Sequence, residues 1–387
     1  MKKIYLDQAS TTYPKPECVA KAVYEYMTGN GCNINRGCYE NAYDTEEIIL
    51  ESRELLCELF DGPDCKNVVF TKNVTESLNV VLKGFLKPDD HVLVSSMEHN
   101  AVMRPIRQLE KEGVSFDRIP CNSQGELNLE VLEHLFKENT KAVILMHASN
   151  VCGTILPLKE VGEFCAAHGL KFIVDCAQTA GALPISMKDC KIDALCFTGH
   201  KGLYGPQGIG GLILQEDMIP LIEPLLSGGT GSISHTEEIP SFMPDRFEPG
   251  TLNLPGIFGL HAAIQWLKET GIDTIHKKES YLTSLFLDKI KHIDPNGDKI
   301  QLIGKKTPDG RTAVVSIQTP GRDVSEIAYL LDKNYGIMTR VGLHCAPSAH
   351  ETLGTYPIGT IRFSFGYFNT EEEVLFAVKA LEEILWN

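Results

Sequence analysis

The sequence has no hydrophobic run long enough to cross a membrane. Its densest apolar stretch is AVILM at residues 142–146, whereas a spanning helix needs about 20 such residues. The N-terminal segment MKKIYLDQAS has two lysines but reaches Asp7 before the apolar core of a signal peptide has formed. We therefore expect a cytoplasmic protein with no membrane partner.

Positive charge is also scarce. The 387 residues include 36 Lys and Arg against 51 Asp and Glu, a formal net charge of −15. Nucleic acids and anionic membrane surfaces select for basic faces, so we expect neither as the main partner. A local basic pocket for a small anion is compatible with this balance.

Cysteine is abundant, but the spacing of metal-binding and redox motifs is missing. None of the 12 cysteines forms a CxxC pair, and they are scattered through apolar segments. Most are expected to be small buried hydrophobic residues in a reducing compartment, and no metal site is expected. A functional cysteine has to be identified by its surroundings.

Short apolar strands alternate with helical segments along much of the chain. Several strands are apolar on both faces, which is typical of a largely parallel sheet covered by helices on two sides. We expect a large α/β domain over residues 14–256 and a smaller α+β domain formed by residues 1–13 and 257–387. The runs behind this prediction are HVLVS, AVILM, KFIVD, ALCFT and GGLIL, with TAVVSIQ and TIRFSFG in the smaller domain.

Two capping boxes and one irregular segment stand between these elements. Asp44 with Glu47, and Thr370 with Glu373, each have the spacing of a capping box at a helix N-terminus. Residues 227–256 are rich in Gly, Pro, Ser and Thr and show little periodicity. So long an irregular segment is usually functional or a linker.

Polar residues follow several of the expected strands. In open parallel sheets, ligands bind outside the carboxyl ends of the strands, so these residues should converge on one site. One strand also leads into a helix expected to begin near Thr75, and the amides of a helix N-terminus suit a phosphate. The residues at the strand ends are His99, Asn150, Asp175, Gln178, His200 and Lys201.

Lys201 lies in a glycine-dense turn. The stretch CFTGHKGLYGPQGIGG has five glycines after the lysine, which let the backbone approach a ligand closely. A lysine amine there can form a Schiff base if desolvation or a neighbouring His200 lowers its pKa. Asp175 can pair with a protonated heterocyclic nitrogen, and Gln178 can bond a phenolic oxygen beside it. The alternatives are an exposed loop lysine and a helix-capping aspartate.

Nine segments, in order along nearly the whole chain, resemble the cysteine desulfurase and selenocysteine lyase family of the class V aminotransferase group. The resemblance implies a fold-type I enzyme that uses pyridoxal 5'-phosphate, with a mainly parallel seven-stranded sheet and a smaller α+β C-terminal domain. It also implies an amino-acid substrate and a homodimer whose active site is shared across the interface. The segments are YLDQASTT, FTKNVTESLN, MEHNA, HASNVCGT, VDCAQ, FTGHKGLYGPQGIGG, FEPGTLN, RVGLHCAP and TIRFSFG.

For the cofactor, the resemblance implies contacts at matched positions. Lys201 would hold it as a Schiff base and move the α-proton, while His99 would stack on the ring. Asp175 would pair with the ring nitrogen and Gln178 with the phenolic oxygen. The residues implied to bind the phosphate or line the cofactor site are Val74, Thr75, Asn150, Thr198, His200 and, from across the dimer interface, Thr251.

For the substrate carboxylate, the resemblance implies Asn150 and Arg362, with Arg340, Asn35 and Arg36 as further substrate-binding residues. The planar guanidinium of arginine suits this task. Related enzymes often have a histidine where Asn35 stands, which leaves the choice among cysteine, selenocysteine and another amino acid open. A Thr at position 198, where Ser is common, is a conservative change.

Cys345 is the residue that distinguishes sulfur or selenium removal from other reactions of this cofactor. It lies in RVGLHCAPSAH among Arg340, His344 and His350, an expected exposed and electropositive setting that favours a thiolate. As a nucleophile it would take sulfur from a cysteine–cofactor adduct, leaving alanine and a persulfide; with selenocysteine it would act more as an acid. The alternatives are an aminotransferase or epimerase in which Cys345 is incidental, and a sulfur-carrier scaffold without cofactor. A sulfur-acceptor or scaffold protein is a further expected partner.

Overall fold

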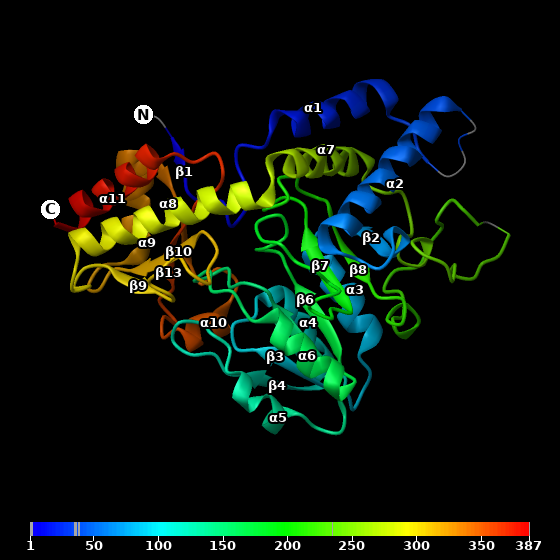
Figure 1. The fold of residues 1–387 in the computed structure, drawn as a ribbon, viewed down its shortest axis with the longest axis horizontal. Coiled ribbons are helices and arrows are strands. Elements are labelled where there is room, and N and C mark those ends of the chain that lie inside the picture. The colour runs from blue at the N-terminus through cyan, green and yellow to red at the C-terminus, as the bar shows by residue number, and fades with distance from the viewer. Residues whose placement is uncertain (1–2, 35–36, 38, 234, 387) are drawn as a thin grey trace.

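The protein is an α/β structure in two parts, as Figure 1 shows. The predicted substrate residues Asn35 and Arg36 lie outside the described residues. Within the described part of the chain, no helix is long and apolar enough to span a membrane. The computed structural model describes residues 3–34, 37, 39–233 and 235–386.

A seven-stranded sheet organises the larger part. Strand β8 is antiparallel to its neighbours β2 and β7, and the remaining pairs are parallel. The mainly parallel seven-stranded sheet is therefore confirmed. In sheet order the strands are β2 Val68–Thr71, β8 Gly210–Leu214, β7 Ala194–Thr198, β6 Lys171–Asp175, β5 Thr140–Met146, β3 His91–Ser95 and β4 Ser115–Ile119.

Helices cover both faces of this sheet. On β5, Val143 and Leu145 join the buried cluster that includes α2, α6 and α7, whereas Ala142 and Ile144 join the cluster that includes α3 and α4. Burial on two sides is the reason that the strands are apolar throughout. The helices of this part are α1 Glu17–Glu25, α2 Glu40–Phe60, α3 Val74–Phe85, α4 Asn100–Glu110, α5 Leu132–Leu135, α6 Leu158–His168 and α7 Leu254–Thr270.

Among the described residues, the smaller part combines two sheets with four helices. One sheet is antiparallel in the order β12-β13-β10-β9, and the other pairs β1 with β11, which joins the N-terminal residues to the C-terminal part. The elements are β1 Ile4–Tyr5, α8 Ile272–Ile293, β9 Gln301–Ile303, β10 Val314–Gln318, α9 Val324–Tyr335, β11 Ile337–Met338, β12 Arg340–Gly342, α10 Pro347–Thr352, β13 Thr360–Ser364 and α11 Glu371–Trp386.

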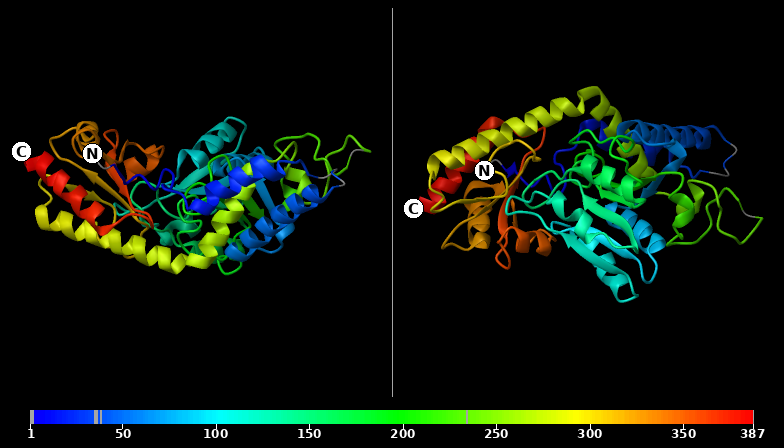
Figure 2. Two further views of the ribbon diagram at one scale, coloured as in Figure 1. Left: turned by 90° about the horizontal axis from the view of Figure 1, so that it is seen from above. Right: turned by 60° about the horizontal axis from the view of Figure 1, so that its bottom comes forward.

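Helix α8 runs from the larger part along the smaller one (Figures 1 and 2). Near its start, Ile275 belongs to the large core, whereas Leu282, Phe286 and Ile290 belong to the small core. Helix α7 packs on α1 and α2, hence with the large sheet. The two cores therefore meet within α8, while the domain division after residue 256 stays a prediction.

The two capping boxes have opposite outcomes. Helix α2 starts before Asp44 and Glu47, so that box is wrong; the helix begins earlier and buries Ala42 completely. Before α11, the Thr370 hydroxyl accepts from the Glu373 amide at 3.3 Å. The Glu373 carboxylate accepts from the Thr370 amide, also at 3.3 Å, so that box is confirmed.

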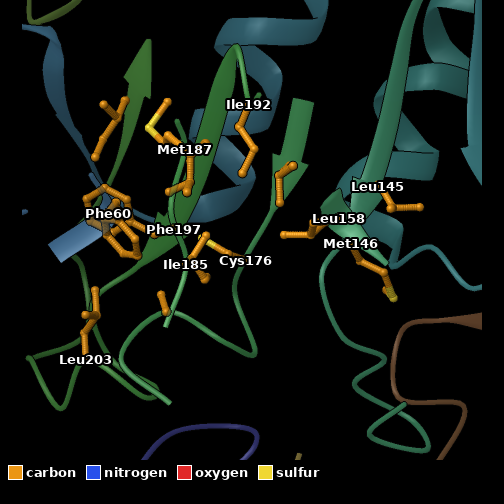
Figure 3. Packing of buried hydrophobic residues seen from close by; sticks show 14 of the residues in the cluster. Phe60, Leu145, Met146, Leu158, Cys176, Ile185, Met187, Ile192, Phe197 and Leu203 are labelled. Atoms are coloured by element: carbon orange, nitrogen blue, oxygen red, sulfur yellow. The ribbon is translucent and has the colours of Figure 1, made fainter. Parts of the chain in front are cut away.

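Tight packing fixes the end of strand β7, as Figure 3 shows. The ring of Phe60, at the end of α2, lies with its centroid 5.7 Å from that of Phe197. Met187, Ile192 and Leu203 are fully buried in the same cluster. Because interiors packed this closely resist rearrangement, the residues after β7 leave the sheet in a defined place.

Candidate active site

The carboxyl ends of β3, β5 and β6 meet at one edge of the large sheet. A small cavity lies there, and six of the residues predicted to bind cofactor or substrate line it. Their convergence is what the rule for ligand sites in parallel sheets led us to expect. These residues are Val74, His99, Asn150, Asp175, Gln178 and Lys201.

Lys201 is held in a turn that follows β7. Its carbonyl accepts hydrogen bonds from the Tyr204 amide at 2.8 Å and from Thr12 Oγ1 at 3.0 Å. Gly202 leaves no room for a side chain, since a Cβ there would lie 2.6 Å from the Ala180 carbonyl oxygen. The turn therefore needs glycine beside the lysine.

The Lys201 amine has a lowered pKa. Burial lowers its pKa to about 8, Arg362 and Arg340 act in the same direction, and Asp175 opposes them. A substantial fraction of the amine is consequently neutral near physiological pH, and the neutral amine is the form that attacks a carbonyl carbon.

Asp175 is a buried carboxylate at the end of β6. Desolvation raises its pKa, while the hydrogen bond from the Ala177 amide to Oδ1, at 2.9 Å, and the charge of Lys201 lower it. A buried carboxylate of this kind is stabilised by a cation, and a protonated pyridine nitrogen can supply one.

His99 caps helix α4 and lines the same cavity. Its Nδ1 accepts from the Ala101 amide at 3.0 Å, which assigns the ring proton to Nε2. Burial, with a smaller effect of Lys201, lowers the pKa of His99 to about 4. The result is a neutral ring in a set orientation, suited to stacking on a flat aromatic ring.

The start of α3 suits an anionic group. Asn73, and not Thr75, is the capping residue, since its Oδ1 accepts from the Glu76 amide at 3.0 Å. The amides of Val74 and Thr75 are in the first turn, where no acceptor exists within the helix and the dipole is positive. Gly210 brings β8 against this point, because a Cβ there would lie 2.8 Å from Asn73 Cα.

Two unpartnered side chains lie at the end of β7 and just after it. Thr198 pairs with Gly210 across β7 and β8 and so lies close to the start of α3. Thr198 Oγ1 and His200 Nδ1 are buried without a hydrogen-bond partner among the described residues. Such atoms are costly unless a ligand satisfies them. With Asp175 for a cationic nitrogen and Lys201 for an aldehyde, these residues fit pyridoxal 5'-phosphate.

Arg362, on β13, is buried beside the predicted Asn150. Its Nη1 donates to the Asn150 carbonyl at 3.0 Å. Its Nη2 donates to Asp7 Oδ1 at 2.8 Å and to Ser10 Oγ at 2.7 Å. The structure thus brings Arg362 and Asn150 together, but it also surrounds the arginine with two residues for which no role was predicted.

The segment that follows β1 was missed as part of the site. Besides Asp7 and Ser10 it contains Lys15, whose Nζ donates to the His200 carbonyl at 2.7 Å. Burial lowers the pKa of Lys15 to about 8. A signal was present, because polar residues follow the apolar run KIYL as they follow the other strands.

Cys345 is exposed in a strained turn. His344 and Cys345 have φ of 47° and 58°, a left-handed conformation that residues other than glycine rarely adopt. The Asn100 amide donates to the Cys345 carbonyl at 2.8 Å, and Asn150 Nδ2 donates to the His344 carbonyl at 2.7 Å. These bonds tie the turn to the cavity-lining segments around His99 and Asn150.

The expected electropositive setting of Cys345 is only partly present. Burial lowers the pKa of His344 to about 2 and that of His350 to about 4. Both rings are therefore neutral, and the expectation that they add positive charge is wrong. Of the three residues expected to make this setting positive, Arg340 remains.

Thr251 lies away from the Lys201 cavity. It is exposed and lines grooves between the irregular segment, α2 and the residues that lead into α3. Its predicted phosphate contact from a second subunit stays a prediction.

Comparison with known proteins identifies relatives along the whole chain. The family model described as aminotransferase class-V matches residues 4–376. A probable cysteine desulfurase of Methanothermobacter thermautotrophicus is 32% identical over 385 residues, 98% of this chain and 94% of that protein. One of Pyrococcus abyssi is 33% identical over 390 aligned positions, 99% of this chain and 94% of that protein.

Solved structures are similar as well. The apo structure of a cysteine desulfurase from Thermococcus onnurineus NA1 has a TM-score of 0.92 and 31% identity, over 99% of this chain and 95% of that one. A cysteine desulfurase from Escherichia coli has a TM-score of 0.87 and 29% identity, over 99% and 94%. The chain therefore belongs to the class V aminotransferase family and, within it, to the cysteine desulfurases.

Proposed function

We propose that this protein uses pyridoxal 5'-phosphate to remove sulfur from L-cysteine, giving L-alanine and a persulfide on Cys345. The observation that carries the proposal is the hydrogen bond from Asn150 to the His344 carbonyl. Asn150 lines the Lys201 cavity, and His344 precedes the exposed Cys345. The cavity and the thiol thus share one connecting residue.

The residues around the cavity have distinct tasks. Bound there, the cofactor supplies an electron sink for reactions at the substrate α-carbon. Lys201 holds the cofactor and moves the α-proton, Asp175 keeps the ring nitrogen protonated, and His99 covers one ring face. The amides of Val74 and Thr75 and the side chains of Thr198 and His200 bind the phosphate. Gln178 binds the phenolic oxygen.

Cys345 performs the sulfur transfer. Its thiolate forms a bond to the substrate sulfur while the bond between that sulfur and Cβ breaks. The electron pair of the broken bond stays with the carbon skeleton, which takes up a proton and leaves as alanine. A thiol reductant then releases the sulfur from Cys345 as sulfide.

Product analysis tests this proposal. Protein loaded with the cofactor and given L-cysteine and dithiothreitol should form alanine and sulfide in equal amounts. Cys345→Ala should abolish both, whereas Cys190→Ala, at a partly buried cysteine away from the cavity, should not. An unaffected Cys345→Ala variant would overturn the persulfide mechanism, and a keto acid in place of alanine would favour an aminotransferase. L-selenocysteine in parallel shows which element the site prefers.

A homodimer is part of the proposal. Large apolar side chains are exposed on α1, on α2 and between these helices, and one of them, Leu50, lines a groove together with Thr251. Such a patch is typical of a protein interface, and a second copy would bring Thr251 to the neighbouring phosphate site. The proposal also includes a sulfur-acceptor protein as a partner and a cytoplasmic location. The exposed residues are Tyr24, Met27, Tyr39, Tyr43 and Leu50.

A further inference from the structure

Ser10 joins the two arginines of the candidate substrate site. Its Oγ accepts hydrogen bonds from Arg362 Nη2 at 2.7 Å and from Arg340 Nη1 at 2.9 Å. The same hydroxyl donates to Asp7 Oδ1 at 2.7 Å. A serine hydroxyl has one proton and two lone pairs, so these three bonds use its full capacity.

The two arginines differ in how firmly they are held. Arg362 is buried and is also bonded to Asp7 and to the Asn150 carbonyl. Arg340 is exposed on the short strand β12, and Ser10 is its side-chain hydrogen-bond partner among the described residues. A surface arginine has many rotamers to lose, so a specific anchor is needed to keep it at one point.

Of the two arginines, Arg340 is the one without an acidic partner among the described residues. Asp7 forms an ion pair with Arg362 at 2.8 Å, and Asp175 acts on Lys201. No carboxylate among the described residues lies within ion-pair distance of Arg340. A guanidinium group without an acidic partner fits a carboxylate ligand, because guanidinium groups bind carboxylates well.

We propose that Ser10 is a positioning residue for substrate recognition: its hydroxyl holds Arg340 beside Arg362, so that both guanidinium groups receive the α-carboxylate of the amino acid. The inference rests on the proposed function for its class of substrate. It adds the residue that sets the affinity for the carboxylate.

Two ligands that differ only in the carboxylate test this role. L-alanine and ethylamine are titrated into the cofactor-loaded protein, and binding is followed by visible absorption. Ser10→Ala should weaken L-alanine binding about tenfold, the scale of one charge-assisted hydrogen bond, and leave ethylamine binding unchanged. Ser10→Thr keeps the hydroxyl and should bind L-alanine as the unaltered protein does.

A double-mutant cycle shows whether Ser10 acts through Arg340. In an Arg340→Ala background, Ser10→Ala should lose most of its effect, because the bond to Arg340 is already gone. With L-cysteine as substrate, Ser10→Ala should raise KM and leave kcat nearly unchanged.

Three results would overturn the inference. The first is unchanged L-alanine binding in Ser10→Ala, and the second is equal weakening of L-alanine and ethylamine binding. The third is that Ser10→Ala weakens L-alanine binding as much in the Arg340→Ala background as in the unaltered protein. The binding readouts do not require sulfur release. A protein that binds L-alanine through Ser10 but yields no sulfide would therefore contradict the proposed function alone.

Discussion

The side-chain amide of Asn150 donates a 2.7 Å hydrogen bond to the carbonyl of His344, the residue before Cys345. The carbonyl of the same asparagine accepts from Arg362 Nη1 at 3.0 Å. Asn150 therefore connects the arginine of the carboxylate site with the turn that presents the thiol.

Asn150→Ala should slow sulfur transfer. Without the amide, the left-handed turn at His344 and Cys345 loses one of the bonds that hold it, and a displacement of about 1 Å can cost about 100-fold in rate. We expect persulfide formation on Cys345 to slow at least about tenfold in a single turnover, measured by rapid quenching and mass spectrometry. Asn296→Ala, at an exposed asparagine, is the control. Unchanged transfer would show that the bond is dispensable.

Attachment of the cofactor to apoprotein should depend on the pKa of Lys201. The amine has a pKa of about 8 in place of the ordinary 10.5, so half of it is in the reactive neutral form at about pH 8 and nearly all of it about one unit higher. The rate of attachment, followed by visible absorption, should level off above that pH. Lys201→Arg should give no covalent attachment. A rate that still rises beyond pH 9 would contradict the lowered pKa.

Asp175 should make apoprotein stability depend on pH. Its pKa is raised above the ordinary 3.8 by burial. The folded state therefore holds this proton more tightly than the unfolded state, and stability is lost as pH rises through the raised pKa. Asp175→Asn apoprotein should have a higher thermal midpoint than the unaltered protein at a pH above the raised pKa, and the difference should shrink as the pH falls towards the ordinary value of 3.8. A difference that does not vary with pH would count against this assignment.

The buried ion pair of Arg53 and Glu248 should stabilise the segment that contains Thr251. Arg53 Nη2 lies 2.6 Å from Glu248 Oε2, and both side chains are buried. Glu248→Ala leaves a buried unpaired cation and should lower the free energy of unfolding by about 3–5 kcal/mol.

Urea unfolding of apoprotein measures this loss. Glu58→Ala is the matched control, because it breaks the exposed pair with Lys268 and should cost at most about 1 kcal/mol. Equal losses of unfolding free energy in the two variants would show that burial does not increase the contribution of the Arg53 pair.

The predicted positions of Asp175, Lys201 and His99 depended on a general rule. Strands that are apolar on both faces imply a parallel sheet, and the carboxyl ends of parallel strands meet at one edge. No knowledge of the side-chain contacts was needed. The ends of helices were predicted less accurately. Asn73 caps α3, although the helix was expected to begin near Thr75. Several neighbouring residues are of types that can cap a helix, so the pattern does not single one out.

The charges around Cys345 could not be read from residue types. His344 and His350 are histidines whose surroundings decide whether they carry a proton, and burial keeps both neutral. The role of Thr251 could not be predicted from its residue type either, because a contact with a second subunit depends on how two chains assemble.

The family, the parallel sheet and the residues at its carboxyl edge could be predicted before folding, because they follow from hydrophobic pattern and from motifs in order. The contacts of Ser10 with Arg340 and Arg362, residues 330 and 352 positions away along the chain, are known only from the folded structure. It also decided the pKa of Lys201 and the hydrogen bond from Asn150 to the Cys345 turn. Such contacts depend on side-chain packing across two parts of the molecule, and no local pattern encodes that packing.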